Sequence, residues 1–276
     1  MREMQTKEIQ QIGLDMMKNI HSFCTKNDIK YSLAYGTMLG AIRHQGFIPW
    51  DDDVDIMMPR PDYERFLQLY KSDDYFLKSV YDKDCYTNFS RLYECKRTRN
   101  IQRAAPCDSK VGVYVDVFPI DGVYDKPSLR EAKYQRIREL ALGRIAYRHI
   151  YPNVKEGKMM SRIHALFSIM KIYVKLGGNI NTIGKKIQRL SSEVILGSTK
   201  SCSYFCCNDA IKANKQEIFP TEAFRKFQLH KFETEMFYVS AYYDEMLTTM
   251  YGDYMTLPPV EKRGTKHDFE KFYWND

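Results

Sequence analysis

Four acidic residues within one five-residue stretch are the clearest candidates for chemistry in this sequence: Asp51, Asp52, Asp53 and Asp55. Residues 53–58 alternate acidic and apolar side chains, which predicts a strand with Asp53 and Asp55 on one face. Two carboxylates so close together need a counter-charge. Hard oxygen ligands suit Mg²⁺ or Mn²⁺, which bind substrate phosphates at the same time. The alternative is a solvated acidic turn, and the apolar residues between the acids argue against it.

Two further features favour the same chemistry. Gly36-Thr37 lies between a strand predicted at 31–35 and a helix predicted at 38–44, a place where backbone N–H groups can contact a phosphate. Asp116 lies inside an apolar strand predicted at 111–118, where an unpaired charge is costly. If a neighbouring strand aligns Asp116 with Asp53 and Asp55, the three carboxylates form a metal-dependent site for phosphoryl chemistry. The sequence contains neither a P-loop nor a G-x-G-x-x-G motif.

Other elements must position these residues. They are predicted as helices over 3–27, 62–70, 128–196 and 241–250, and as a hairpin around Lys231 within 224–239. Inside the long helical region, residues 163–176 are apolar on most of the helix circumference. That pattern fits a buried core helix, and it also fits a helix that lies on a membrane surface.

Composition and charge exclude several classes of protein. Of 276 residues, 44% are apolar, which excludes a disordered chain. No uncharged apolar stretch approaches about 20 residues, so we expect no membrane-spanning helix. The N-terminus lacks the apolar core of a signal peptide, so we expect a cytoplasmic protein. The net charge is +7 overall, but residues 126–189 contain fifteen Lys and Arg against three Glu. Such a basic segment favours anionic partners.

The seven cysteines include no C-x-x-C pair. In a cytoplasmic chain this pattern indicates reduced and mostly buried thiols. The one cluster contains Cys202, Cys206 and Cys207, and it gives only weak support for zinc, which usually draws on two closely spaced ligand pairs.

The order of these features resembles the nucleotidyltransferase fold. The run GTMLGAIRHQGFIPWDDDVDIMMPRPDYERFL resembles the LicD family, which includes bacterial phosphocholine transferases and is related to fukutin-type ribitol-phosphate transferases. VDVFPIDGV at 115–123 and YGDYMTLPP at 251–259 also resemble that family. The resemblance implies an α/β (α+β) fold with a mixed-sheet, nucleotidyltransferase-like core and a mainly helical basic insertion. We expect a catalytic core at 1–125, the basic segment at 126–200, and a C-terminal part at 201–276 that packs back on the core.

The resemblance also implies roles for particular residues. Asp53, Asp55 and Asp116 match the metal-binding acids, and Asp116 would ligate the metal or take the acceptor's proton. Further matches, expected to contact nucleotide or substrate, are Gly36, Thr37, Arg43, His44, Trp50 and Asp52. Arg91, on a plausible strand, is a further phosphate candidate by its charge. Trp50 is suited to stack on a base or a choline cation, or to belong to the core. Arg263 and His267 resemble C-terminal basic positions of the family, and their chemistry stays open.

The implied function is metal-dependent transfer of phosphocholine, or of a related phospho-alcohol, from CDP-choline or a similar CDP-alcohol, with release of CMP. The acceptor would be a hydroxyl of a lipid-linked glycan precursor of teichoic acid, capsule or lipopolysaccharide. The basic middle segment predicts peripheral binding to the anionic inner face of the plasma membrane. Two alternatives stay open: transfer of a nucleoside monophosphate from an NTP, and a basic nucleic-acid-binding protein without catalysis. We expect no nucleic-acid partner, because no RNA- or DNA-binding motif occurs.

Overall fold

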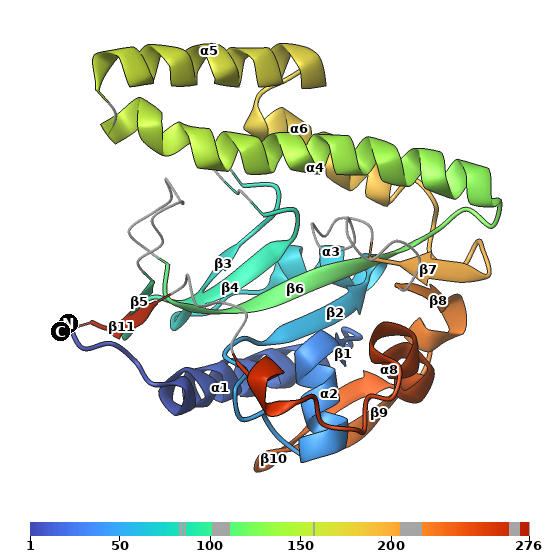
Figure 1. Cartoon of the computed structure of the whole chain (residues 1–276). Coiled ribbons are helices and arrows are strands. Elements are labelled where there is room, and N and C mark those ends of the chain that lie inside the picture. The colour runs from blue at the N-terminus through green and yellow to red at the C-terminus, as the bar shows by residue number, and fades with distance from the viewer. Residues whose placement is uncertain are drawn as a thin grey trace.

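The computed structural model has an α+β fold with a mixed, strongly curled sheet, as predicted (Figure 1). It describes residues 1–82, 85, 87–100, 111–156, 158–204, 217–264 and 271–275, without the side chains of 148, 149 and 151–156. Cys107, Cys206, Cys207 and His267 lie outside the described residues. None of the helices in the described ranges combines the length and the hydropathy that crossing a membrane requires.

The main sheet carries the strand order β1-β2-β6-β4-β3, and β7 and β8 continue it from one end of β6. β2 and β6 are parallel, whereas the other pairs are antiparallel. The strands of this sheet are β1 (Ser32–Leu33), β2 (Asp55–Pro59), β3 (Tyr75–Lys78), β4 (Ser90–Glu94), β6 (Val113–Gly122), β7 (Ser201–Ser203) and β8 (Ile218–Pro220). Two small antiparallel pairs stand apart: β5 (Thr98–Asn100) with β11 (Phe272–Trp274), and β9 (Phe227–Phe232) with β10 (Glu235–Ser240).

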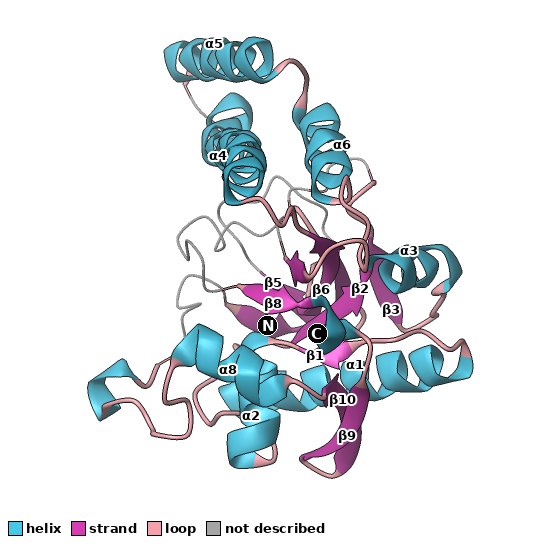
Figure 2. Ribbon diagram, turned by 90° about the vertical axis from the view of Figure 1, so that its right-hand side faces the viewer, coloured by secondary structure: helices cyan, strands magenta, loops and turns pink. Residues whose placement is uncertain are grey.

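Helices lie on two opposite sides of this sheet (Figures 1 and 2). On one side are α1 (Thr6–Lys26), α2 (Tyr35–His44) and α8 (Tyr243–Tyr251), together with the β9–β10 hairpin. On the other side stand α4 (Pro127–Glu156), α5 (Met159–Leu176) and α6 (Ile180–Ser191), with α5 farthest from the sheet. The remaining elements are α3 (Arg60–Leu69) and the short 3₁₀ turns at Thr221–Phe224 and Val260–Lys262.

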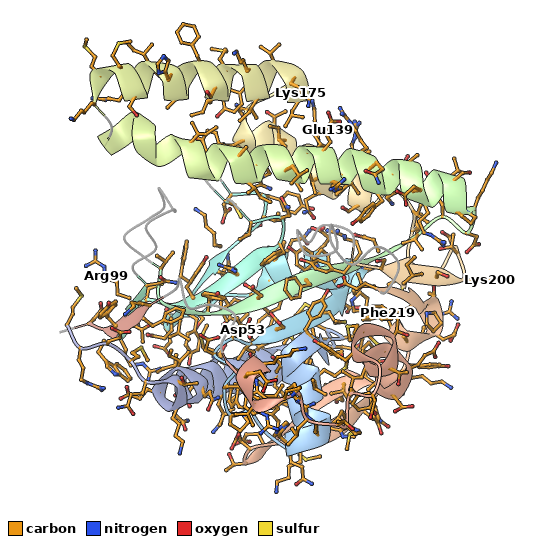
Figure 3. The ribbon with its side chains drawn as sticks, in the orientation of Figure 1. Asp53, Arg99, Glu139, Lys175, Lys200 and Phe219 are labelled. Atoms are coloured by element: carbon orange, nitrogen blue, oxygen red, sulfur yellow. The ribbon has the colours of Figure 1, made fainter. Side chains whose placement is uncertain are left out.

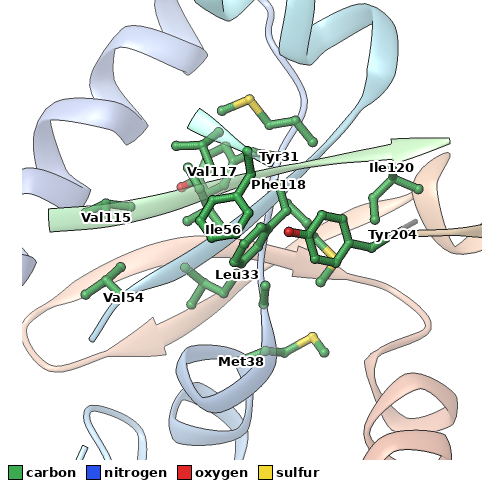
Figure 4. Close-up of a cluster of buried hydrophobic side chains, with 14 of the residues drawn as sticks. Tyr31, Leu33, Met38, Val54, Ile56, Val115, Val117, Phe118, Ile120 and Tyr204 are labelled. Atoms are coloured by element: carbon green, nitrogen blue, oxygen red, sulfur yellow. The ribbon is translucent and has the colours of Figure 1, made fainter. Parts of the chain in front are cut away.

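The hydrophobic core surrounds β6, which is buried along its whole length. Leu33, Ile56 and Val117 come from three neighbouring strands and lie in one apolar cluster with Phe118 and Tyr204 (Figure 4). A strand covered on both faces needs apolar side chains at nearly every position. The sequence VYVDVFPIDG meets that need, with Asp116 and Asp121 as its two acidic exceptions.

Several element boundaries differ from the prediction. β2 begins at Asp55, so Asp53 precedes the strand. Helix α2 begins at Tyr35, which places Gly36 and Thr37 inside its first turn instead of before it. The hairpin turns at residues 233–234, because Glu233 adopts a positive φ of 54° there, and Lys231 is part of β9. The region 128–196 divides into three helices, and α5 presents an exposed apolar side, which contradicts the interpretation of 163–176 as a fully buried core helix.

The described cysteines are free thiols, in agreement with the prediction. Cys24 and Cys202 are fully buried, and burial raises the pKa of the Cys202 thiol to about 12. A thiol with such a pKa is protonated and unreactive at neutral pH.

Candidate functional site

Three charged residues form a row across the centre of the sheet. The register places Asp55 of β2 opposite Asp116 of β6, and Asp116 opposite Arg91 of β4. Residues in register on adjacent strands project from the same face. Arg91 donates two hydrogen bonds to Asp116, from Nε to Oδ1 at 2.5 Å and from one terminal nitrogen to Oδ2 at 3.0 Å. Asp55 and Asp116 are both buried, with 9% and 7% of their surface exposed.

The first turn of α2 is fixed to the start of β2. The backbone N–H of Asp55 donates to the Thr37 hydroxyl at 2.9 Å, and the N–H of Ala34 donates to the Asp55 carbonyl at 2.9 Å. Thr37 is buried, so its hydroxyl positions Asp55. The phosphate contact expected of Gly36 and Thr37 stays a prediction.

The Asp51 carboxylate lies against this same helix turn. A Cβ atom added at Gly36 would stand 2.6 Å from Asp51 Oδ2, so a side chain at this position would displace the Asp51 carboxylate. Unpaired N–H groups and the helix dipole make a helix N-terminus favourable for an anion. The backbone of the acidic loop is held by Gln10 of α1, whose amide donates to the carbonyls of Ile48 and Asp51 at 3.2 and 2.8 Å.

The acidic loop brings three carboxylates together. Within the part of the chain that the structure describes, Asp51, Asp52 and Asp53 form a group whose oxygen atoms lie within 4.8 Å of one another, each residue being half-buried. The loop ends where β2 begins, and Figure 3 labels Asp53 at this end of the sheet. Asp53 thus groups with Asp51 and Asp52 in the loop, whereas Asp55 and Asp116 belong to the row across the sheet. The sharing of one metal ion by Asp53, Asp55 and Asp116 stays a prediction.

Burial and neighbouring negative charges disfavour the ionised form of Asp55. Burial raises the pKa of the Asp55 carboxyl well above its usual value, and the negative charges of Asp53, Asp116 and Asp51 raise it further, whereas Arg91 lowers it. A divalent cation bound among these carboxylates would offset their mutual repulsion, and carboxylate oxygens are the ligands that Mg²⁺ and Mn²⁺ prefer. The carboxylates of Asp51, Asp53, Asp55 and Asp116 are therefore of the chemical kind that suits such an ion.

The predicted phosphate-binding arginines already have protein partners. Arg91 is paired with Asp116, and its guanidinium carbon lies 4.0 Å from the ring centre of Tyr114. Arg43 donates to the carbonyl of Tyr254 at 2.7 Å, and burial lowers the pKa of its guanidinium. Arg43 thus connects α2 to the C-terminal segment. Phosphate contacts by Arg43 and Arg91 stay predictions.

The aromatic and basic residues beside the acidic loop lie together. His44 meets Trp50 edge to face, with ring centres 6.3 Å apart, and burial together with the nearby charge of Arg43 lowers the pKa of the imidazole. The guanidinium of Arg263 lies 5.5 Å from the Trp50 ring centre. The cation that faces Trp50 in the structure is therefore the guanidinium of Arg263. Stacking of Trp50 on a base or a choline cation stays a prediction.

The sequence reasoning left three residues out of the site. Asp51 is named among the acids but is given no role, and its carboxylate lies against Gly36 in the first turn of α2. Tyr251 ends α8 and is 41% exposed as a whole residue, while loss of water around its hydroxyl raises the pKa of that group, as do the charges of Asp55, Asp51 and Glu217. Glu217 also accepts a hydrogen bond from Tyr35 at 3.3 Å. The stretch YGDYMTLPP begins at Tyr251, so its likeness to the family was the available signal.

Comparison with known proteins points to one family. Residues 28–139, which carry α2, β2, β4 and β6, match the family described as LicD/FKTN/FKRP, nucleotidyltransferase domain. The chain is 29% identical over 283 aligned positions, 99% of each protein, to the lipopolysaccharide cholinephosphotransferase LicD of Haemophilus influenzae. Uncharacterized proteins of Rickettsia typhi and Rickettsia prowazekii are 52% identical over 20% of the chain and 40% identical over 30% of it, covering 18% and 29% of their own lengths. Residues 28–139 therefore form a nucleotidyltransferase domain of the LicD type, and similarity to a LicD transferase extends over nearly the full length of the chain.

Proposed function

We propose that this transferase moves phosphocholine, or a related phospho-alcohol, from a CDP-alcohol such as CDP-choline to a hydroxyl of a cell-surface glycan precursor, and releases CMP. The observation that carries the proposal is the acidic site itself, with the row of Asp55, Asp116 and Arg91 beside the loop of Asp51 to Asp53. Full-length similarity to a lipopolysaccharide cholinephosphotransferase supports this choice of reaction. The acceptor would be a lipid-carried precursor of lipopolysaccharide, teichoic acid or capsule at the inner face of the plasma membrane.

The reaction is a substitution at the phosphorus that carries the alcohol. The acceptor hydroxyl oxygen forms a bond to this phosphorus and gives up its proton, while the bond to the bridging oxygen breaks and CMP leaves with that oxygen. Bound Mg²⁺ or Mn²⁺, held by Asp53 and Asp55 with Asp51 or Asp116, would neutralise phosphate charge. Arg91 fixes both oxygens of Asp116, so this carboxylate is suited to orient the acceptor hydroxyl. The first turn of α2 offers N–H groups to the donor diphosphate.

Product analysis tests the reaction class. We expect the purified chain with CDP-choline, Mg²⁺ and a glycan acceptor to release CMP and to transfer the choline phosphate. Asp53→Asn, Asp55→Asn and Asp116→Asn should each lower the rate on the order of 100-fold or more, since each removes a carboxylate that would hold or orient the groups stabilising the reacting phosphate, the metal ion above all. The exposed Asp73 lies in the loop between α3 and β3, so Asp73→Asn is a matched control. Pyrophosphate release from an NTP, without consumption of any CDP-alcohol, would favour nucleotidyl transfer and contradict the proposal.

The donor head group needs a separate measurement. A ligand that binds only the folded chain raises its melting temperature. We expect a thermal-shift screen with Mg²⁺ to give the largest increase with CDP-choline among the choline, ethanolamine, glycerol and ribitol donors. An equal increase with CMP alone would show that the alcohol group is not recognised.

A further inference from the structure

Helix α5 exposes an apolar stripe that the chemistry of the site does not use. Seven large apolar side chains on it are between 38% and 76% exposed: Met159, Met160, Ile163, Leu166, Phe167, Met170 and Val174. At about 100° per residue, all seven positions fall within about 120° of the helix circumference and so lie on one side of the helix. Phe167 and Val174, near its middle and its end, are 65% and 76% exposed. Contiguous exposed apolar surface of this kind marks a binding surface.

The opposite side of α5 is occupied by the protein. Ala165, Ile169 and Leu176 are buried, and Ile169 packs with Tyr147 of α4 and Ile180 of α6. Figures 1 and 2 agree that α5 stands outermost, with α4 and α6 between it and the sheet. Figure 3 shows side chains on the outer side of α5 that point away from the rest of the described chain. No element among the described residues covers the stripe.

Charge identifies the partner of this stripe. Residues 157–192 contain no Asp or Glu, whereas Lys158, Arg162, Lys171 and Lys175 lie on or beside α5. Lys175 makes a 3.9 Å contact to Glu139 yet stays 72% exposed at its side chain. An apolar stripe with basic flanks is the pattern of a helix that lies in the headgroup region of an anionic bilayer. Two α5 helices docked through this stripe would bring basic residues together without acidic partners on either helix, which disfavours self-association.

We propose that α5 is a membrane-docking helix that lies in the plane of an anionic phospholipid surface, with the apolar stripe inserted and Lys171 and Lys175 facing the headgroups. The inference deepens the proposed function. It rests on that function only to explain why docking would be useful. A chain held at the membrane meets an acceptor carried by a lipid at high local concentration.

Vesicle co-sedimentation without any substrate tests the docking. We expect wild-type protein to bind vesicles of phosphatidylcholine with phosphatidylglycerol, and to bind vesicles of phosphatidylcholine alone much more weakly. The double variant Phe167→Glu with Met170→Glu should bind anionic vesicles more than about tenfold less tightly, because two apolar side chains no longer enter the lipid. Lys171→Gln with Lys175→Gln should weaken binding about fivefold for each charge removed. Addition of salt should weaken wild-type binding as well.

The matched control is Ile195→Glu with Leu229→Glu, which also replaces two apolar side chains by Glu, at positions that are 72% and 46% exposed in the loop after α6 and in β9. This control adds the same two negative charges as Phe167→Glu with Met170→Glu. At a salt concentration that screens these charges, it should bind vesicles as tightly as wild type. A Phe167→Trp variant should show a blue shift in fluorescence when anionic vesicles are added. Melting curves and CMP release with a water-soluble acceptor check that the variants are folded, and they separate failure of docking from failure of the transferase proposal.

Three results would overturn the inference. The first is unchanged vesicle binding by Phe167→Glu with Met170→Glu. The second is equal binding to neutral and anionic vesicles, or binding to neither. The third is a wild-type dimer in light scattering that becomes a monomer in the same double variant, which would assign the stripe to a second copy of the chain.

Discussion

Asp55 and Asp116 are buried acids whose surroundings limit what they can do. Asp55 has a raised pKa because it is buried beside other carboxylates, and Asp116 has both oxygens bound by Arg91. The sequence predicted Asp55 from its alternation with Asp53 and apolar residues, and it predicted Asp116 because a lone acid among apolar strand residues is costly unless it has a partner. It did not predict that Arg91 would be this partner, because pairing across strands depends on the register of β4 and β6. The contact of Asp51 with α2 was not predicted for a similar reason, since it depends on how the loop meets this helix.

The Arg91–Asp116 ion pair gives a prediction about stability. The two side chains are 13% and 9% exposed, so removal of one partner leaves a buried charge uncompensated. We expect Arg91→Met to lower the free energy of unfolding by about 3–5 kcal/mol in a denaturant titration. Adding Asp116→Asn in the same chain should recover part of this loss. An Arg91→Met variant within about 0.5 kcal/mol of wild type would show that the pair does not stabilise the fold.

At the scale of elements, the sequence predicted whether a segment is a helix or a strand better than it predicted where the element begins and ends. The alternation at 53–58 indicated β2, but the strand starts only at Asp55, where the Thr37 hydroxyl and the Ala34 N–H hold its first residue. The break between α5 and α6 had a local signal, since Gly177 adopts a positive φ of 67° and Asn179 caps the next helix. The apolar content of 163–176 could not distinguish a core helix from a surface helix, because composition does not show which side other elements cover.

The cap of α6 can be tested directly. The Asn179 side chain accepts hydrogen bonds from the N–H groups of Asn181 and Thr182 at 3.1 and 3.0 Å. We expect Asn179→Ala to lower the free energy of unfolding by about 1 kcal/mol, since two N–H groups at the helix start lose their acceptor. Asn179→Asp keeps an acceptor and should change stability much less. Equal losses in both variants would mean that the amide matters for another reason.

The whole molecule joins the acidic candidate site to a basic helical arm, which consists of α4, α5 and α6. The resemblance of residues 35–67 to the LicD family predicted the mixed α/β fold around the sheet, since the motif lies within one short stretch of sequence. The arm carries no such motif, and its position against the sheet depends on contacts between distant residues. Arg144 of α4, for example, donates to the Asn88 side chain at 2.8 Å and to the Cys85 carbonyl. Such a contact cannot be predicted from local pattern.

Global stability should depend on pH through His21. Burial lowers the pKa of His21 below its ordinary value of 6.5, which the charge of Glu235 partly opposes, and the imidazole bonds the Tyr31 hydroxyl at 2.7 Å. The unfolded chain therefore takes up a proton more readily, and stability is lost as pH falls from 6.5 through the lower, folded pKa. We expect melting temperatures between pH 8 and pH 5 to fall less steeply in His21→Gln than in wild type or in the exposed control His164→Gln. Parallel curves for all three proteins would exclude this role of His21.

Metal binding is the most direct test of the account, since the proposed chemistry depends on one divalent ion among these carboxylates. Electron paramagnetic resonance titration with Mn²⁺ measures it without any substrate. We predict that wild type binds Mn²⁺, that Asp53→Asn and Asp55→Asn bind it at least about tenfold more weakly, and that Asp73→Asn binds it as wild type does. Asp51→Asn should behave as the two site variants do if the loop and the row share the ion. Mn²⁺ binding of equal strength in all of these variants would contradict the account.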